Sequence, residues 1–297
     1  MKNVEDAVIL AGGVGTRMLP ASVFVPKEIM SLVDTPLINH LIWEASKAGV
    51  KRIHIVVSPS KKNILSEALL ESESWGSQIR PDLPRISLQP VPSDVEILLH
   101  EQFEPGGVGD AISIVAKLIK SPFLVILGDN LLIKEHVGPE NSGVEFASNA
   151  SKELVDYFNE TGIACCGISE VSLEEVSKYG IVKINEGLVE EIIEKPKPEN
   201  APSRYILCGR YVLPEETGAL LDKYTSSEYG ELQSIALFNH FIENGGFGGV
   251  DLENYVLYDS GDPLNWLKSQ IDHALRREDI NKDFKNWINQ RISDENT

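Results

Sequence analysis

The sequence is poor in cysteine and in long apolar runs, and each shortage excludes a class of protein. Its three cysteines, Cys165, Cys166 and Cys208, form neither a disulfide framework nor a Cys-x-x-Cys metal motif. No stretch reaches the roughly eighteen apolar residues that a membrane-spanning helix needs. The first apolar run is short and follows Glu5 and Asp6, unlike a signal peptide. We therefore expect a cytoplasmic protein.

Basic residues are also scarce. The chain has 27 Lys and Arg against 45 Asp and Glu, a net charge of −18. Nucleic acids and membrane surfaces are anionic, so this balance argues against both as partners. A small phosphorylated ligand stays compatible with it, because a few local cations are enough to bind one.

The spacing of apolar residues predicts one α/β core with elaborations. Strand and helix patterns alternate up to about residue 130, which indicates βαβ units and a mainly parallel sheet. Four short strands follow between 163 and 213 and favour an antiparallel or mixed extension. The chain is helical from Pro263 onward. The elements expected in the first half are strands at 7–11, 52–57, 95–99 and 123–127, helices at 36–48, 60–70 and 110–119, and a loop at 72–94.

A glycine-rich loop at residues 10–20 follows the first predicted strand. Glycines let the backbone approach a ligand closely, and Arg17 adds a cation suited to phosphate. The loop is not a P-loop, since no Lys-Ser or Lys-Thr follows. It is not a dinucleotide fingerprint either, because Met18 stands where the third glycine should be. A phosphate-binding loop and a plain strand–helix turn both remain open.

Two aspartates each follow an apolar run. Asp129 comes after 123–127 and Asp259 after 255–258. A carboxylate at the end of a central strand lies over the ligand crevice and suits Mg²⁺. The alternative is a helix cap or a turn, which for Asp129 is about as common as a ligand role and for Asp259 is the more common role.

Three further segments carry groups suited to a phosphorylated ligand. Lys27 follows Pro26 shortly after the glycine loop, and Glu194 and Lys195 precede Pro196. A second glycine loop at 102–111 offers the amide of Gln102 and a helix N-terminus, which suit a nucleobase edge near a phosphate. The plain alternatives are a surface lysine, an exposed strand end and a flexible connection.

These pieces occur in a fixed order along the chain, at residues 12–20, 26–28, 33–38, 102–111, 128–129, 179–180, 194–197, 209–213, 231–233 and 259–261. In this order the sequence resembles the sugar-1-phosphate nucleotidylyltransferases, and within them the bacterial enzymes that act on UTP and glucose 1-phosphate. The resemblance spans roughly residues 5–275.

The resemblance implies a Rossmann-like nucleotidyltransferase fold, of the glycosyltransferase-A-like kind, with a mixed central sheet flanked by helices. It implies a domain over 1–275, with a nucleotide-binding part at about 1–130 and a sugar-binding part at about 131–260. A helical tail at 276–297 is a possible oligomer contact in a dimer or tetramer. The implied reaction joins UTP and glucose 1-phosphate into UDP-glucose and diphosphate, with Mg²⁺ as cofactor.

Roles follow from the resemblance by position. Arg17, Lys27 and Lys195 would be catalytic, and Asp129 and Asp259 would hold the metal ion. The nucleotide would contact Ala11, Gly12, Gly13, Gly15, Thr16, Gln102, Gly107 and Asp129. The sugar would contact Gly180, Glu194, Lys195, Gly209 and Glu231.

The sequence departs from the family pattern at a few positions. Asn130 follows the first metal aspartate, and Gly106 stands where the uridylyltransferases usually have Lys. Two alternatives stay open: a thymidylyltransferase that uses dTTP, and a non-catalytic regulator that binds sugar nucleotides. An NAD-dependent oxidoreductase is disfavoured by Met18 and by the lack of a ribose-binding acid.

Overall fold

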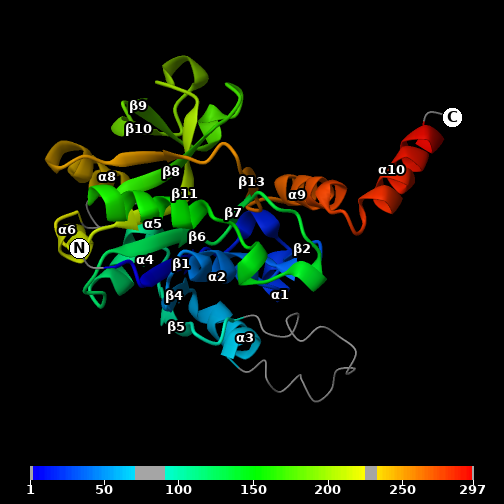
Figure 1. Cartoon of the computed structure of the whole chain (residues 1–297), viewed down its shortest axis with the longest axis horizontal. Helices are drawn as coiled ribbons and strands as arrows, with labels where there is room; N and C mark the ends of the chain where they lie inside the picture. Colours follow the sequence, from blue (N-terminus) through cyan, green and yellow to red (C-terminus); the bar gives the residue numbers. More distant parts are fainter. Residues whose placement is uncertain (1–2, 71–90, 225–232, 296–297) are drawn as a thin grey trace.

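A mixed sheet runs through the centre of the chain (Figure 1). The computed structural model describes residues 3–70, 91–224 and 233–295. Within these residues the strand order is β5-β4-β1-β6-β11-β8-β12-β10-β9. The strands are β1 (Asp6–Ala11), β4 (Arg52–Val57), β5 (Glu96–Glu101), β6 (Phe123–Leu127), β8 (Cys165–Glu170), β9 (Gly180–Asn185), β10 (Leu188–Glu194), β11 (Tyr205–Leu213) and β12 (Gly248–Asp251). Short pairs join β2 (Ser31–Leu32) to β3 (Thr35–Pro36) and β7 (Asn130–Ile133) to β13 (Val256–Asp259).

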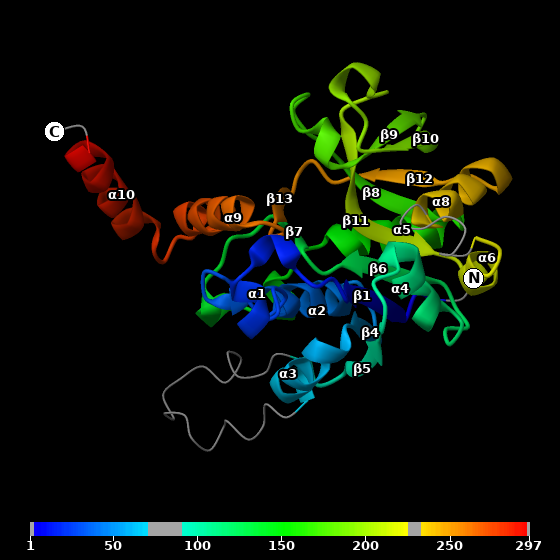
Figure 2. The same ribbon diagram turned by 180° about the vertical axis from the view of Figure 1, so that it is seen from behind.

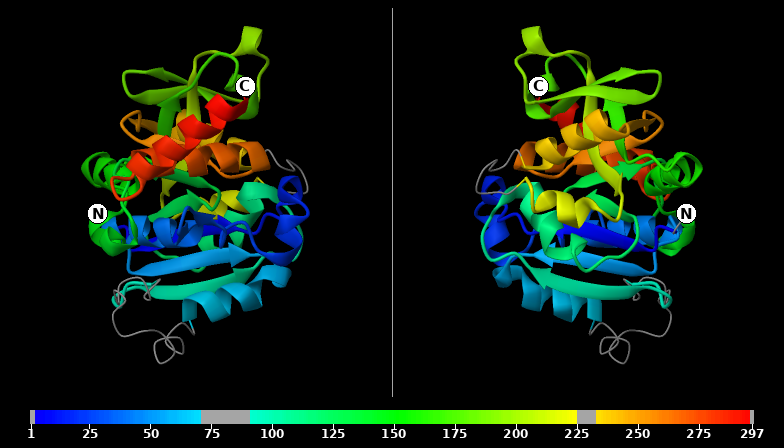
Figure 3. Two further views of the ribbon diagram at one scale, coloured as in Figure 1. Left: turned by 90° about the vertical axis from the view of Figure 1, so that its right-hand side faces the viewer. Right: turned by 90° about the vertical axis from the view of Figure 1, so that its left-hand side faces the viewer.

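The first half of the sheet is parallel, as the alternating pattern predicts. β1 lies between β4 and β6, and all three run the same way. Their alternating apolar residues pack helices on both faces. The helices are α2 (Leu37–Lys47), α3 (Pro59–Leu70), α4 (Gly107–Ala116), α5 (Ala150–Thr161), α6 (Thr217–Leu221) and α8 (Gln233–Asn244). Views along the long axis show them on either side of the sheet (Figure 3).

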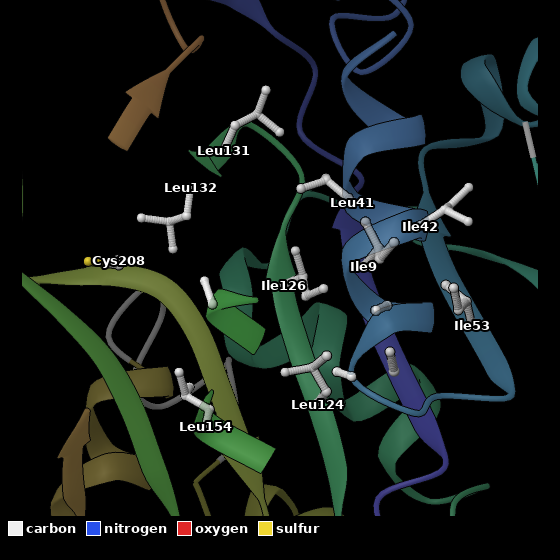
Figure 4. Packing of buried hydrophobic residues seen from close by; sticks show 14 of the residues in the cluster. Ile9, Leu41, Ile42, Ile53, Leu124, Ile126, Leu131, Leu132, Leu154 and Cys208 are labelled. Atoms are coloured by element: carbon white, nitrogen blue, oxygen red, sulfur yellow. The ribbon is translucent and has the colours of Figure 1, made fainter. Parts of the chain in front are cut away.

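The main hydrophobic cluster fills the space between the parallel strands and α2. Ile9 of β1 and Ile53 of β4 are fully buried there with Leu41 and Ile42 of α2 (Figure 4). Leu124 and Ile126 of β6 extend the same cluster. This packing fixes the carboxyl ends of β1 and β6 side by side, and the site is built on those ends.

The second half is mixed, because β11 runs antiparallel to both of its neighbours, β6 and β8, while β12 runs parallel to β8. The pairing of β11 with β8 shifts register between Leu207 and Tyr211. Gly209 lies inside that bulge with a φ of 73°. The predicted mixed extension is confirmed.

The predicted helix at 110–119 is displaced: α4 is Gly107–Ala116 and begins inside the second glycine loop. Gly106 caps it, and Gly107 and Gly109 lie in its first turn, so residues that indicated a loop belong to the helix. Of the loop predicted at 72–94, residues 72–90 lie outside the described part of the chain.

The tail forms two helices, α9 (Pro263–Arg276) and α10 (Asn281–Glu295). α9 is fixed to the β2–β3 hairpin: Gln270 Nε2 donates to the Ser31 carbonyl at 2.6 Å, and the Val33 N–H donates to Gln270 Oε1 at 2.6 Å. Arg277 is buried and pairs with Asp34 at 2.6 Å. α10 extends away from the body (Figures 1 and 2). No helix in the described ranges is long and apolar enough to cross a membrane.

Candidate active site

The first glycine loop leaves the carboxyl end of β1 and leads into two short helices, η1 (Thr16–Met18) and α1 (Ala21–Phe24). Gly15 has a φ of 70°, a conformation that favours glycine. Its carbonyl accepts a 2.8 Å hydrogen bond from Ser22 Oγ. Ala11 is buried, whereas Gly13 and Thr16 are exposed at the mouth of the loop. The predicted loop therefore lies where a ligand can reach it.

A buried lysine that the sequence analysis did not single out holds this loop. Lys61 of α3 donates to the carbonyls of Ala11 at 2.9 Å and Gly13 at 2.6 Å. Its ammonium also lies 2.9 Å from both carboxylate oxygens of Glu28. Lys62 is its half-buried neighbour and pairs with Glu101. Lys61 lies four and eight residues before Leu65 and Leu69, the other buried residues of α3, so its helical spacing is the signal that distinguishes it from Lys62.

Burial acts on both members of the inner pair. It lowers the pKa of Lys61 and raises the pKa of Glu28, and the attraction between the two charges opposes both shifts. Glu28 follows Lys27 directly. Glu28 is thus held inside the protein, while the neighbouring Lys27 faces the site.

Asp129 lies beside the loop because β1 and β6 are parallel neighbours. A Cβ at Gly128 would stand 2.5 Å from the Leu10 carbonyl, so only glycine permits the close approach. Lys27 Nζ is 2.6 Å from Asp129 Oδ2. Ser260 donates to the Asp129 carbonyl from its N–H at 3.0 Å and its Oγ at 2.8 Å. Lys27 and Asp129, predicted from separate motifs, meet in one ion pair.

Asp259 ends β13, and its backbone pairs with Asn130 of β7, next to Asp129. The Gly261 N–H donates to Asp259 Oδ1 at 2.8 Å. A Cβ at Gly261 would stand 2.8 Å from Arg17 Nη2, so Arg17 reaches the same corner. Burial raises the pKa of Asp259, and the hydrogen bond from Gly261 opposes this rise. The negative charge of Asp129 raises the pKa further, whereas the positive charge of Arg17 lowers it.

The two aspartates fit a magnesium ion in their chemistry. Both offer carboxylate oxygens, and Mg²⁺ takes one or two protein carboxylates together with substrate phosphates. The charge of Asp129 disfavours ionisation of Asp259, and a divalent cation between them would remove that repulsion. No set of three His, Cys, Asp or Glu side chains suited to a metal occurs among the described residues.

The predicted nucleobase residues also converge. Gln102 follows β5, is 8% exposed, and its N–H donates to the Val57 carbonyl at 2.8 Å. Its Oε1 lies 2.5 Å from where a Cβ of Gly12 would be. Its Nε2 donates to Asp110 Oδ2 at 2.7 Å and to the Gly107 carbonyl at 3.4 Å. The sequence analysis gave Asp110 no role of its own.

The predicted sugar residues come from the second half of the sheet. Glu194 of β10 pairs in register with Gly180 of β9. Lys195 has a φ of 45°, and its N–H donates to the Tyr179 carbonyl at 3.0 Å. Its Nζ lies 3.1 Å from Glu194 Oε1. Burial, followed by the charge of Asp259, raises the pKa of Tyr179 to about 12.

Gly209 joins the two halves. A Cβ there would stand 3.0 Å from Asn130 Nδ2 and from Leu127 Cβ, in addition to the unfavourable φ. Asn130, which departs from the family pattern, therefore lies against Gly209, a predicted sugar residue. Glu231, the remaining predicted sugar residue, lies outside the described part of the chain.

The Nucleotidyl transferase family matches residues 6–255. The chain is similar to the UTP–glucose-1-phosphate uridylyltransferase of Staphylococcus epidermidis, with 32% identity over 98% of this chain and 99% of the relative. It is also similar to the solved UDP-glucose pyrophosphorylase of Acinetobacter baumannii, with 26% identity, 97% and 99% coverage and a TM-score of 0.81. The UTP-bound UGPase from Acinetobacter baumannii gives 27% identity, 96% and 98% coverage and a TM-score of 0.79.

Proposed function

The chain belongs to the nucleotidyl transferase family, and on this premise we propose that it transfers the uridylyl group of UTP to glucose 1-phosphate. The products are UDP-glucose and diphosphate. The observation that carries the proposal is the meeting of Lys27, Asp129, Asp259 and Arg17 at the mouth of the glycine loop. The names of the full-length relatives support the choice of UTP and glucose 1-phosphate.

In the proposed reaction a phosphate oxygen of glucose 1-phosphate attacks the α-phosphorus of UTP. The bond from that phosphorus to the bridging oxygen of the β-phosphate breaks, and diphosphate leaves with the electron pair. The nucleophile is already an anion, so no strong general base is required. Positioning and neutralisation of charge lower the barrier. This agrees with a site rich in cations and carboxylates.

Each group has a part in this scheme. Arg17 and Lys27 would bind the triphosphate and neutralise charge on the departing diphosphate. Lys195 would bind the sugar phosphate, with Glu194 accepting hydrogen bonds from the sugar hydroxyls. Asp129 and Asp259 would hold Mg²⁺, which when bound draws charge from the phosphate oxygens.

Diphosphate release tests the proposal. Purified protein is incubated with Mg²⁺, glucose 1-phosphate and each nucleoside triphosphate in turn, and the nucleotide sugar is identified by mass. We expect release with UTP and a product of the mass of UDP-glucose. Release with dTTP but not with UTP would instead identify a thymidylyltransferase. Binding of UDP-glucose without release from any triphosphate would identify the regulator.

We also propose that the tail mediates assembly with a second copy. α10 extends from the body, and Trp287 on it is 53% exposed. An isolated helix of this length is marginal in water, so a partner would stabilise it. Light scattering on the full chain and on a Trp287→Lys variant tests this: the variant should have the lower mass, and equal masses would contradict it.

A further inference from the structure

We propose that Asp110 is a positioning residue that selects the nucleobase by fixing the side-chain amide of Gln102. This inference rests on the proposed function, because it concerns the base of the triphosphate. Asp110 lies in the first turn of α4, half-buried, and its Oδ2 accepts from Gln102 Nε2 at 2.7 Å.

The chemistry of Asp110 decides which way the amide points. An ionised carboxylate has no hydrogen to give, so only the NH₂ side of the amide can face it. The Gly107 carbonyl lies on the same side and is also only an acceptor, 3.4 Å from Nε2. The turned amide would place oxygen against two acceptors. One orientation of Gln102 is therefore favoured by both neighbours.

The opposite side of the amide is then its oxygen, and it faces the glycine loop. Oε1 lies 2.5 Å from the position that a Cβ of Gly12 would take. Any side chain at 12 would compete for the space beside this oxygen. The backbone of Gln102 is fixed at the end of β5 by its bond to Val57, and its side chain is held by Asp110.

An acceptor held in this place distinguishes the pyrimidines. Uracil and thymine carry a hydrogen on N3 and can donate to Oε1. Cytosine carries a lone pair on N3, which would face the oxygen and leave both acceptors unpaired. A site built around one hydrogen bond rejects a ligand that cannot make it. Asp110 would thus favour UTP over CTP without touching the base, and would not separate UTP from dTTP.

Gly106 makes room for Asp110. A Cβ at Gly106 would lie 2.5 Å from Asp110 Cγ and 2.6 Å from its Oδ2. The backbone of Gly106, with φ −84° and ψ 8°, is open to any residue, so the requirement for glycine is steric. Gly106, which stands where the family usually has Lys, and the carboxylate of Asp110 therefore depend on each other in this chain.

The test measures kcat/KM for UTP, dTTP and CTP in the full chain and in Asp110→Asn. An asparagine can donate as well as accept, so it permits both orientations of Gln102. We expect the UTP to CTP ratio to fall about 10-fold to 100-fold, while the UTP to dTTP ratio stays the same. Ser113→Ala is the matched control, since Ser113 lies on α4 and donates only to the Asp110 carbonyl; its ratios should be those of the parent.

A second pair of variants separates this role from a merely structural one. If Asp110 acts through Gln102, Asp110→Asn should not change the UTP to CTP ratio further in a Gln102→Ala background. Gly106→Ala should lower the ratio in the same direction as Asp110→Asn, by pushing the carboxylate aside. An equal loss with all three triphosphates in Asp110→Asn would overturn the proposal, because it indicates only a helix N-terminus that has lost its acid.

Binding measurements keep this test independent of turnover. Calorimetric titration with UTP and CTP, without sugar phosphate, reports base selection even if the protein does not release diphosphate. Selective binding of UTP that Asp110→Asn abolishes would support the inference in that case, although the proposed reaction would have failed. Equal binding of UTP and CTP by the parent chain would contradict the inference while leaving the reaction standing.

Discussion

Two lysine–glutamate pairs, one in each half of the molecule, are built in opposite ways. Lys61 and Glu28, in the half predicted to bind the nucleotide, have side chains 7% and 0% exposed. Lys195 and Glu194, in the half predicted to bind the sugar, have side chains 59% and 34% exposed. The first pair holds the glycine loop by its carbonyls, whereas the second is joined to the body through the backbone of Lys195.

The difference indicates that the two halves prepare their ligands differently. A buried ammonium that is bonded to four oxygens has no freedom to follow a ligand, so the glycine loop is shaped before UTP binds. Lys195 keeps an accessible charge, and in the proposed scheme a sugar phosphate would take the place of Glu194 beside it. We therefore expect damage to the first pair to be seen in stability and damage to the second in binding of one substrate.

The largest effect should come from Asp129. Asp129→Asn keeps the shape of the side chain but removes the charge that would hold the cation, so turnover should fall about 10³-fold. The fold should persist, as circular dichroism can show. Asp94→Asn is the control, because Asp94 forms an exposed pair with Lys51. Undiminished turnover in Asp129→Asn would refute the metal assignment.

Lys61→Met tests the comparison through the free energy of unfolding. It leaves the Glu28 carboxylate buried without a partner, which should cost about 3–5 kcal/mol of unfolding free energy in urea. Lys62→Met, one residue on, removes only a partly exposed pair and should cost less than about 1 kcal/mol. Adding Glu28→Gln to Lys61→Met should restore part of the loss. Equal effects at 61 and 62 would show that burial does not separate the two lysines.

The interface between α2 and α9 gives a prediction for pH. Burial lowers the pKa of His40 to about 4, and burial together with His40 and His136 lowers that of His273 to about 3. Both histidines stay neutral in the folded protein but bind protons below pH 6.5 in the unfolded chain. Their contribution to the free energy of unfolding is therefore fully present above pH 6.5 and is lost as the pH falls toward 4. Each contributes up to about 1.4 kcal/mol per pH unit.

Urea titrations at pH 8, 7, 6 and 5 measure this loss. In His40→Gln the slope of unfolding free energy against pH should be shallower below pH 6.5 and unchanged between pH 7 and 8. If the curves of unfolding free energy against pH were parallel for the parent and His40→Gln over the whole range, His40 would not resist protonation in the folded protein.

The smallest effect on stability should come from Lys195. Lys195→Ala should raise KM for glucose 1-phosphate about 10-fold to 100-fold, because a charged partner of the phosphate is lost. Unfolding free energy should change by less than about 1 kcal/mol. Lys183→Ala removes a comparable exposed pair with Glu190 and should change neither quantity. If Lys195→Ala raised only the KM for UTP, the assignment of Lys195 to the sugar phosphate would be wrong.

Much of the site could be predicted from local sequence. The glycine loop, Asp129 and Asp259 each follow an apolar run, so their place at strand ends was readable without contacts. Lys61 was not found in this way, because Lys61 and Lys62 have the same chemistry and only the helical spacing of Lys61 with Leu65 and Leu69 sets it apart. The beginning of α4 was misplaced for a similar reason: glycines indicate a loop locally, and the packing of α4 on β1 and α6 overrides that preference.

The sequence by itself determined the strands, most helices and the chemical groups at their ends, since apolar spacing and glycine positions act over a few residues. The tertiary structure alone decided which groups the Lys61 ammonium binds, which side of the Gln102 amide faces the glycine loop, and that Lys27 meets Asp129. Each of these depends on burial or on partners far apart in the chain, and neither is encoded in the local pattern.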